Sequence, residues 1–151
     1  MSSSPIKFGR STEFLNVDLD LRSSSGLKVI VRAIGHKMLV LNSSAGFASL
    51  ELATQPRTAE DAVRRIAQIV NSLPVEGRRS WDRCKSRHLN IGIQAGHGPH
   101  ERHFRLSRTA LAHALGIRAA ILITIYAPPK KGPSIPGRKE AGKVIAPKKS
   151  R

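Results

Sequence analysis

The sequence is poor in acidic residues, in cysteine and in aromatic residues. Ten acidic residues stand against 26 lysines and arginines, so the formal net charge is +16 at neutral pH. A chain this basic attracts polyanions through its long-range field, but that attraction carries no information about sequence or substrate. The single cysteine, Cys84, excludes an internal disulfide, which fits a reducing compartment. Since no second thiol is present for redox chemistry, we interpret Cys84 as a small buried apolar residue.

Long apolar segments are also missing. The longest apolar run, at 119–127, is interrupted by Thr124 and is too short to cross a bilayer. The N-terminal residues MSSSPIKFGR lack the apolar centre of a signal peptide. We therefore expect a cytoplasmic protein with no membrane partner.

The rest of the composition supports one folded domain with two polar ends. Hydrophobic residues make up 40% of the 151 residues, which is enough for a single core. We expect a flexible N-terminus at 1–11, a single domain at 12–128, and a disordered tail at 129–151 that is rich in proline, glycine and lysine. Residues 130–151 contain eight basic residues and one acidic residue, so they carry +7 and leave +9 for the remainder.

Two stretches alternate apolar and polar residues, which is the period-two pattern of a strand with one buried face. The first stretch covers 15–21 and the second covers 89–93. Leucine, valine and isoleucine occupy the odd-numbered positions in both, and asparagine, aspartate or glycine the even-numbered ones. We expect these two strands to lie side by side.

The order of the predicted elements indicates an α+β fold. Strands are expected at 12–21, 38–41, 47–53 and 87–96, and amphipathic helices at 27–34 and 59–73. Strand, helix, strand, strand, helix, strand is the order of a ferredoxin-like sandwich, whose first and last strands are antiparallel neighbours. One of the serines at 23–25 is expected to cap the first helix.

A second unit follows the sandwich. A brief strand at 104–106, a helix at 108–115 with Ser107 as its N-cap, and a last strand at 118–127 are expected. The prediction is therefore a ferredoxin-like βαββαβ sandwich with an added βαβ unit. Its sheet would be mixed or antiparallel, with helices on one face.

A single layer of helices would leave the other sheet face to solvent or to a partner. The residues predicted on this open face are Asn16, Asp18, Asp20, Asn90 and Gln94. Asp18 and Asp20 project to the same side of a strand and could hold a divalent cation or share a proton. No third acid stands near them in the sequence, so we favour a solvated strand face with no catalytic residue.

The histidines at positions 97, 100 and 103 recur every three residues. His97, His100 and His103 could bind a metal, but their spacing matches no standard zinc signature, and Gly98 and Pro99 indicate a surface loop. We therefore predict neither a metal site nor a cofactor.

Basic residues surround the only tryptophan. Trp81 could stack on a nucleic-acid base, or it could cover the end of the core; with so few aromatic residues to form a stacking platform, we favour the core. The residues that would contact a polyanion are Arg78, Arg79, Arg83, Lys85 and Arg87, together with Lys130, Lys131, Arg138, Lys139, Lys143, Lys148, Lys149 and Arg151 of the tail.

Four motifs in combination are distinctive: EFLNVDLDL at 13–21, WDRCKSR at 81–87, LNIGIQAG at 89–96 and ITIYAP at 123–128. On these motifs the chain resembles a family of uncharacterised bacterial hypothetical proteins. The resemblance covers about 12–128 and omits the tail. It implies a bacterial cytoplasmic domain, and it supplies no activity, cofactor or catalytic residue.

Two functions fit these observations. The leading hypothesis is a non-catalytic module that binds a protein partner, or a second copy of itself, through the open sheet face. An acidic pair within a basic body disfavours phosphate at that place, which favours protein over nucleic acid there. The alternative is a nucleic-acid-binding accessory protein that uses the tail and the basic residues at 78–87, with nonspecific affinity. An enzyme or a metal protein is the least favoured class.

Overall fold

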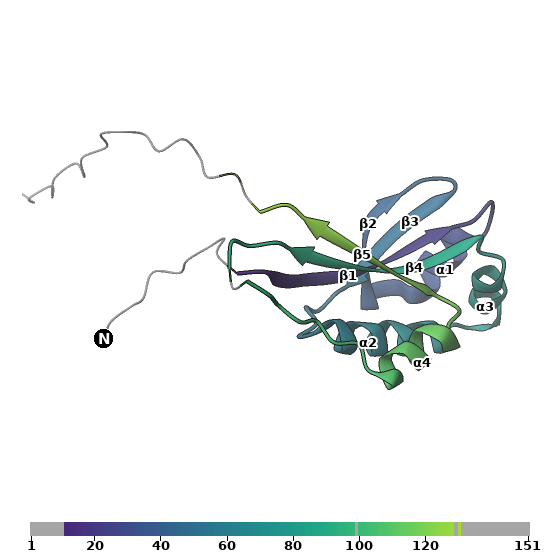
Figure 1. The fold of residues 1–151 in the computed structure, drawn as a ribbon. Coiled ribbons are helices and arrows are strands. Elements are labelled where there is room, and N and C mark those ends of the chain that lie inside the picture. Colours follow the sequence, from purple (N-terminus) through teal and green to yellow (C-terminus); the bar gives the residue numbers. More distant parts are fainter. Residues whose placement is uncertain (1–10, 99, 129, 131–151) are drawn as a thin grey trace, which may run out of the picture.

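The computed structural model describes residues 11–98, 100–128 and 130 (Figure 1). The expectations for 1–11 and 129–151 therefore lie outside the described residues, except at Ser11 and Lys130. The strands are β1 (Glu13–Arg22), β2 (Met38–Ser43), β3 (Phe47–Leu52), β4 (Ser86–Gln94) and β5 (Ala120–Tyr126). The helices are α1 (Leu27–Ile34), α2 (Ala59–Asn71), α3 (Val75–Asp82) and α4 (Arg108–Gly116), and a short 3₁₀ turn, η1 (Gly35–Lys37), follows α1.

The strands form one mixed sheet in the order β2-β3-β1-β4-β5. The first four strands pair antiparallel, and β5 lies parallel to β4 at the edge. The prediction that the strands at 15–21 and 89–93 lie side by side is confirmed, because β1 and β4 pair along most of their length. The fold is α+β, and its strand order is compatible with a ferredoxin-like sandwich extended by one strand.

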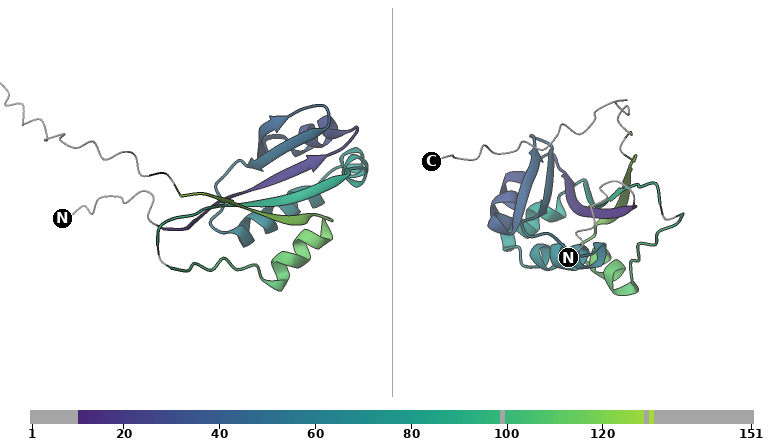
Figure 2. Two further views of the ribbon diagram at one scale, coloured as in Figure 1. Left: turned by 45° about the horizontal axis from the view of Figure 1, so that its top comes forward. Right: turned by 90° about the vertical axis from the view of Figure 1, so that its left-hand side faces the viewer.

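Helices cover one face of this sheet, as Figure 2 shows. On β1, Val17, Leu19 and Leu21 are fully buried, whereas the side chains between them are partly exposed. The same alternation recurs on β4. Because successive side chains of a strand point to opposite faces, this pattern places the core between the sheet and the helices and leaves the other face open.

Helix α2 packs on the sheet through a continuous apolar side. Val63, Ile66 and Val70 are fully buried at helical spacing. The Thr58 side chain accepts a hydrogen bond from the backbone N–H of Asp61, so Thr58 caps the helix. Helix α4 lies beside α2 beneath the sheet (Figure 1) and begins at the predicted cap, Ser107.

One predicted cap and one predicted strand are wrong. No serine caps α1; its N-cap is Gly26, at a φ of 84°, and the Ser23 hydroxyl donates instead to the Ser25 carbonyl. The residues at 104–106 form no strand. Phe104 and Leu106 pack against the core from an irregular segment, because the chain here crosses beneath the sheet from β4 to α4. The spacing of the two apolar residues indicated correctly that they pack against the core, but it did not predict the conformation of the backbone.

The interpretations of Trp81 and Cys84 as core residues are confirmed. Trp81 is 1% exposed, and its indole N–H donates to the Ile117 carbonyl at 3.0 Å. Burial raises the pKa of the Cys84 thiol, against the lowering effect of Arg87 and of hydrogen bonds, so Cys84 is an unreactive thiol. Of the helices in the described residues, none is long and apolar enough to span a membrane.

Candidate functional site

Hydrogen-bonded side chains cross four neighbouring strands on the open face of the sheet. The Ser49 hydroxyl on β3 donates to Asp20 on β1 at 2.6 Å, and the Asn90 amide on β4 donates to the other oxygen of Asp20 at 3.3 Å. Asn90 in turn accepts from the Thr124 hydroxyl on β5 at 2.7 Å. These bonds hold the polar side chains of the face in fixed positions.

Asp18 lies in the middle of this face. Its cross-strand neighbours are Glu51 on β3 and Asn90 on β4. Glu51 accepts a hydrogen bond from the Asn16 amide, whereas no side-chain hydrogen bond to Asp18 is found among the described residues. Burial, and then the charges of Asp20 and Glu51, raise the pKa of Asp18 to about 6. Asp18 is thus a half-buried carboxylate that has two like charges beside it and, within the described residues, no cation paired with it.

Sequence reasoning found two acids on this face and missed the third. Glu51 is distant from Asp18 in the sequence, and only the β1–β3 register brings the two opposite each other. A signal was present, since Ser49 and Glu51 are the polar residues that alternate with the buried Ala48, Leu50 and Leu52. Together with the predicted register of the sandwich, that alternation would have placed Glu51 on the open face. We call Asn16, Asp18, Asp20, Glu51 and Asn90 the acidic face.

Gln94 shares the open side of the sheet but has a different set of contacts. Its amide donates to the backbone carbonyl of Ala127 at 2.8 Å. It therefore holds the chain that leaves β5 against the end of β4, on the open side. The other predicted members, Asn16, Asp18, Asp20 and Asn90, are brought together by the β1–β4 pairing.

Apolar side chains border the acidic face along β5. A Cβ atom at Gly92 would lie 3.6 Å from the Tyr126 ring and 3.7 Å from Leu15, so these two side chains flank the glycine. Leu122 is the β5 partner of Asn90 and is exposed. Leu15 was predicted to face the core, but a β-bulge between Phe14 and Asn16 moves its side chain toward solvent.

The basic residues of the alternative hypothesis lie on α3, in the turn that follows it and at the start of β4, and the arginines among them have partners within the protein. Arg87 stacks over Trp81 and donates to the carbonyls of Trp81 and Cys84, at 2.8 Å and 2.9 Å. Arg78 donates to the Val70 carbonyl, and Arg79 pairs with Glu76. Arg83 bonds to the Ser80 hydroxyl. Of the tail residues, Lys130 alone is described.

The three loop histidines do not converge on a common point. His97, His100 and His103 are all exposed, and the contact made by His103 is with Glu101 at 3.4 Å. Within the described ranges, no group of three or more histidine, cysteine or acidic side chains could hold a metal ion.

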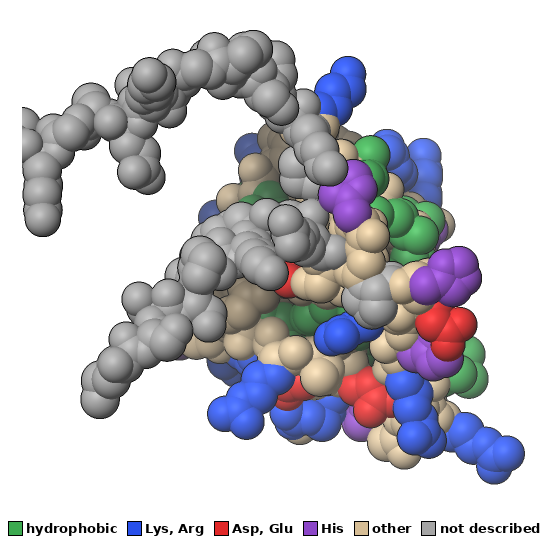
Figure 3. All heavy atoms as spheres, turned by 60° about the vertical axis from the view of Figure 1, so that its left-hand side comes forward, with side chains coloured by type: hydrophobic (Ala, Val, Ile, Leu, Met, Phe, Trp, Pro, Cys, Tyr) green, Lys and Arg blue, Asp and Glu red, His purple; other side chains and the backbone are tan. Residues whose placement is uncertain are grey.

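A hollow of about 600 Å³ opens where α2 begins, and sequence reasoning missed it. Figure 3 looks onto this end of the molecule, where basic, acidic and histidine side chains are mixed. The charged and titratable residues that line the hollow are Glu13, Arg57, Glu60, Arg102, His103 and Arg105. Because side chains of both signs surround it, the hollow does not select a ligand of one charge.

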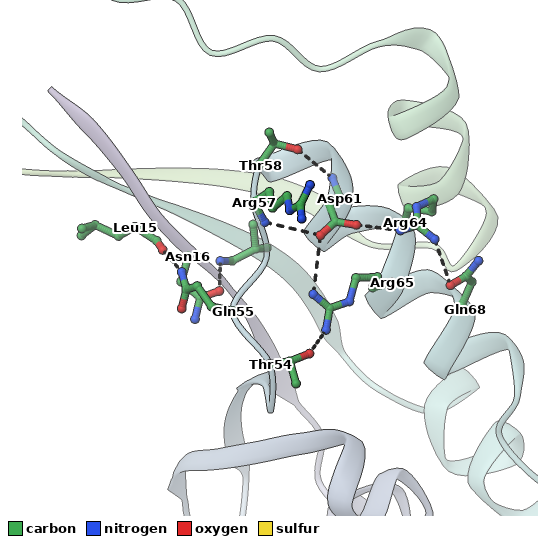
Figure 4. Close-up of polar contacts among 11 residues, drawn as sticks. Leu15, Asn16, Thr54, Gln55, Arg57, Thr58, Asp61, Arg64, Arg65 and Gln68 are labelled. Atoms are coloured by element: carbon green, nitrogen blue, oxygen red, sulfur yellow. Dashed lines mark hydrogen bonds and ion pairs between the residues drawn. The ribbon is translucent and has the colours of Figure 1, made fainter.

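A polar cluster beside the hollow fixes the start of α2 (Figure 4). Asp61 pairs with Arg64 at 2.6 Å and with Arg65 at 3.5 Å, and Arg65 also donates to Thr54. Desolvation opposes ionisation of Asp61, but the hydrogen bonds from Arg64 and the Arg57 amide and the charges of both arginines outweigh it and lower the Asp61 pKa. The side chains of Arg64 and Arg65 therefore bind other residues of this protein.

No family model, curated protein or solved structure matches this chain.

Proposed function

We propose that the protein is a non-catalytic binding module whose acidic face recognises a cationic segment of a protein partner. The observation that carries this proposal is Asp18, a half-buried carboxylate between two further acids that has no hydrogen-bond donor or cation from the described part of the chain. A lysine or arginine placed there would relieve the repulsion and give Asp18 a partner.

The charge distribution supports this choice of ligand. The chain has ten acidic residues in all, and three of them gather on the acidic face of a molecule with a net charge of +16. Phosphate groups are drawn to the protein as a whole and repelled from this place. A cationic segment experiences the opposite preference, so the acidic face selects it by sign of charge.

The hydrogen bonds of the face support recognition rather than random attraction. Asp20 and Asn90 are held by Ser49 and Thr124, so a ligand meets side chains that are already ordered. Less conformational entropy is then lost on binding. The exposed Leu122 and Tyr126 add apolar area beside the charges, and apolar and aromatic side chains form the buried core of protein interfaces.

The test is calorimetric binding of an oligolysine peptide to the full chain. The variant Asp18→Asn with Glu51→Gln removes two charges from the face, and Glu76→Gln with Glu101→Gln removes two exposed charges elsewhere. We expect the face variant to bind about fivefold more weakly, since two partly exposed charge pairs contribute about 0.5 kcal/mol each. The matched control should bind as the unmodified chain does. Equal affinity in both variants would refute the proposal.

A further inference from the structure

We infer that the C-terminal segment, residues 130–151, is itself a ligand of the acidic face and competes there with the partner. This inference rests on the proposed function and names a second, intramolecular occupant for the same site. Three features of the molecule support it: the charge of the segment, the place where the chain leaves the sheet, and the distance the chain has to cover.

The charges of the two parts are complementary. Residues 130–151 carry +7, and the acidic face holds Asp18, Asp20 and Glu51 without a basic side chain bonded to any of them among the described residues. The rest of the chain is itself basic and repels the segment. The acidic face is therefore the place on the sheet where the segment is attracted rather than repelled.

The chain leaves β5 on the side that the acidic face occupies. Gln94 belongs to the open side of β4, and its amide donates to the Ala127 carbonyl at 2.8 Å. The backbone N–H of Ala95 also donates to the Tyr126 carbonyl at 2.9 Å. These bonds tie the first residues after β5 to the open side of the sheet, so the following segment starts beside the acidic face.

The distance to Asp18 is short for a segment of this length. The register aligns Asp18 with Asn90 and Leu122, and Tyr126 with Gln94. Asp18 therefore lies two strands across from β5, about 10 Å, and four residues back from Tyr126, about 13 Å. An extended chain advances about 3.3 Å per residue, so about six residues beyond β5 cover this path. Arg138, Lys139 and Lys143 are all within reach.

Tethering makes the segment an effective competitor even if each charge pair is weak. A ligand that belongs to the same chain as its site has an effective concentration that can reach the millimolar range. A partner must therefore displace the segment, and any change that neutralises its lysines would open the face.

Two measurements on full-length chains test the inference. The first is coupling by a water-soluble carbodiimide, which joins a carboxylate to a lysine amine in direct contact, followed by peptide mapping of the monomer. We expect tail lysines to be joined to Asp18, Asp20 or Glu51. Coupling spread equally over Glu76, Glu101 and the acidic face would overturn the inference.

The second measurement is oligolysine binding to a chain in which every lysine and arginine of 130–151 is replaced by glutamine. We expect binding about tenfold tighter than to the unmodified chain. Adding Asp18→Asn with Glu51→Gln should abolish this gain, which separates competition at the face from a general loss of repulsion.

The outcomes distinguish the two proposals. If the neutral-tail chain and the unmodified chain bind the peptide equally well through the face, the inference is wrong and the proposed function stands. If neither chain binds the peptide at the face, the proposed function is wrong. The carbodiimide coupling pattern then shows whether the acidic face binds the C-terminal segment but no separate partner.

Discussion

A close backbone contact at Gly96 joins the end of β4 to the start of β1. A Cβ atom at this position would lie closer than 3.0 Å to the backbone of Ser11, and the Gly96 N–H donates to the Thr12 hydroxyl at 3.1 Å. Backbone cannot yield as a flexible side chain does, so we expect Gly96→Ala to lower the free energy of unfolding by about 2 kcal/mol. Urea denaturation measures this loss.

The matched control for Gly96 is another glycine. Gly116 lies in the last turn of α4, and a Cβ atom there would meet no atom within 4 Å. Gly116→Ala should leave stability unchanged or raise it by up to about 1 kcal/mol. A Gly96→Ala protein as stable as Gly116→Ala would show that the contact with Ser11 is not kept in solution.

Asp18 predicts a distinctive dependence of stability on pH. Its pKa of about 6 in the folded chain lies above the ordinary value, so the folded state binds the proton more tightly than the unfolded state. Folding is therefore penalised progressively as the pH rises from about 4 to 6, and the penalty is complete above 6. The charged groups around Asp18 are Asp20 on the same strand and Glu51 on β3, and the titratable His88 on β4 is the partner of Asp20.

We therefore expect Asp18→Asn to stabilise the protein at pH 7.5, by about 1 kcal/mol once solvent screening of this half-buried group is allowed for. The gain should vanish near pH 4, where Asp18 is protonated. The measurement is made in about 0.5 M salt, which suppresses docking of the C-terminal segment. Burial, the largest cause of the raised Asp18 pKa, persists in salt. Denaturant midpoints across this pH range measure the difference. A gain of equal size at both pH values would contradict the assignment.

At the scale of elements, the sequence predicted which side of each strand or helix is buried better than it predicted contacts between distant residues. Period-two alternation identified the buried side of β1 and β4, and with it four of the five residues of the acidic face. Helical spacing located α1 and α2. These features are encoded by neighbours in the chain, so a local pattern is enough to find them.

The features that sequence reasoning missed depend on residues far apart in the chain. Glu51 lies opposite Asp18 only because of the β1–β3 register. Leu15 is exposed because of a β-bulge, and no residue type in the sequence indicates that bulge. The contact between Gly96 and Ser11 closes the two ends of neighbouring strands. Each of these needs the three-dimensional pairing, and the pairing is set by the whole core rather than by any one segment.

The two edges of the sheet differ in how they are protected. β2 carries a register shift between Val40 and Asn42, a bulge of the kind that discourages edge pairing. β5 pairs with β4 in unbroken register and exposes Ile123, Ile125 and Tyr126. Leu122 and Tyr126 pair with Asn90 and Gln94 on the side of the acidic face, whereas Ile123 and Ile125 pair with the buried Ile91 and Ile93 on the helix side, so β5 exposes apolar side chains on both of its faces.

At the scale of the whole molecule, the same basic segment has two competing attractions. The full charge of +16 draws the chain to nucleic acid, and residues 130–151 contribute +7 of it. Arg78, Arg79 and Arg87 contribute less than their number suggests, because their guanidinium groups are bonded within the protein. Nonspecific DNA binding should therefore depend mainly on the C-terminal segment.

A segment held on the acidic face is less available to DNA. Because of this competition, we expect one variant to change the affinities for oligolysine and for DNA in opposite directions. Asp18→Asn with Glu51→Gln should weaken oligolysine binding, yet it should strengthen binding of a random-sequence DNA duplex severalfold. The control Glu76→Gln with Glu101→Gln makes the same change in net charge and should strengthen DNA binding less. Fluorescence anisotropy over a range of salt concentrations measures both affinities and their salt slopes. Equal strengthening by the two variants would mean that net charge alone governs DNA binding, and that the acidic face does not hold the segment.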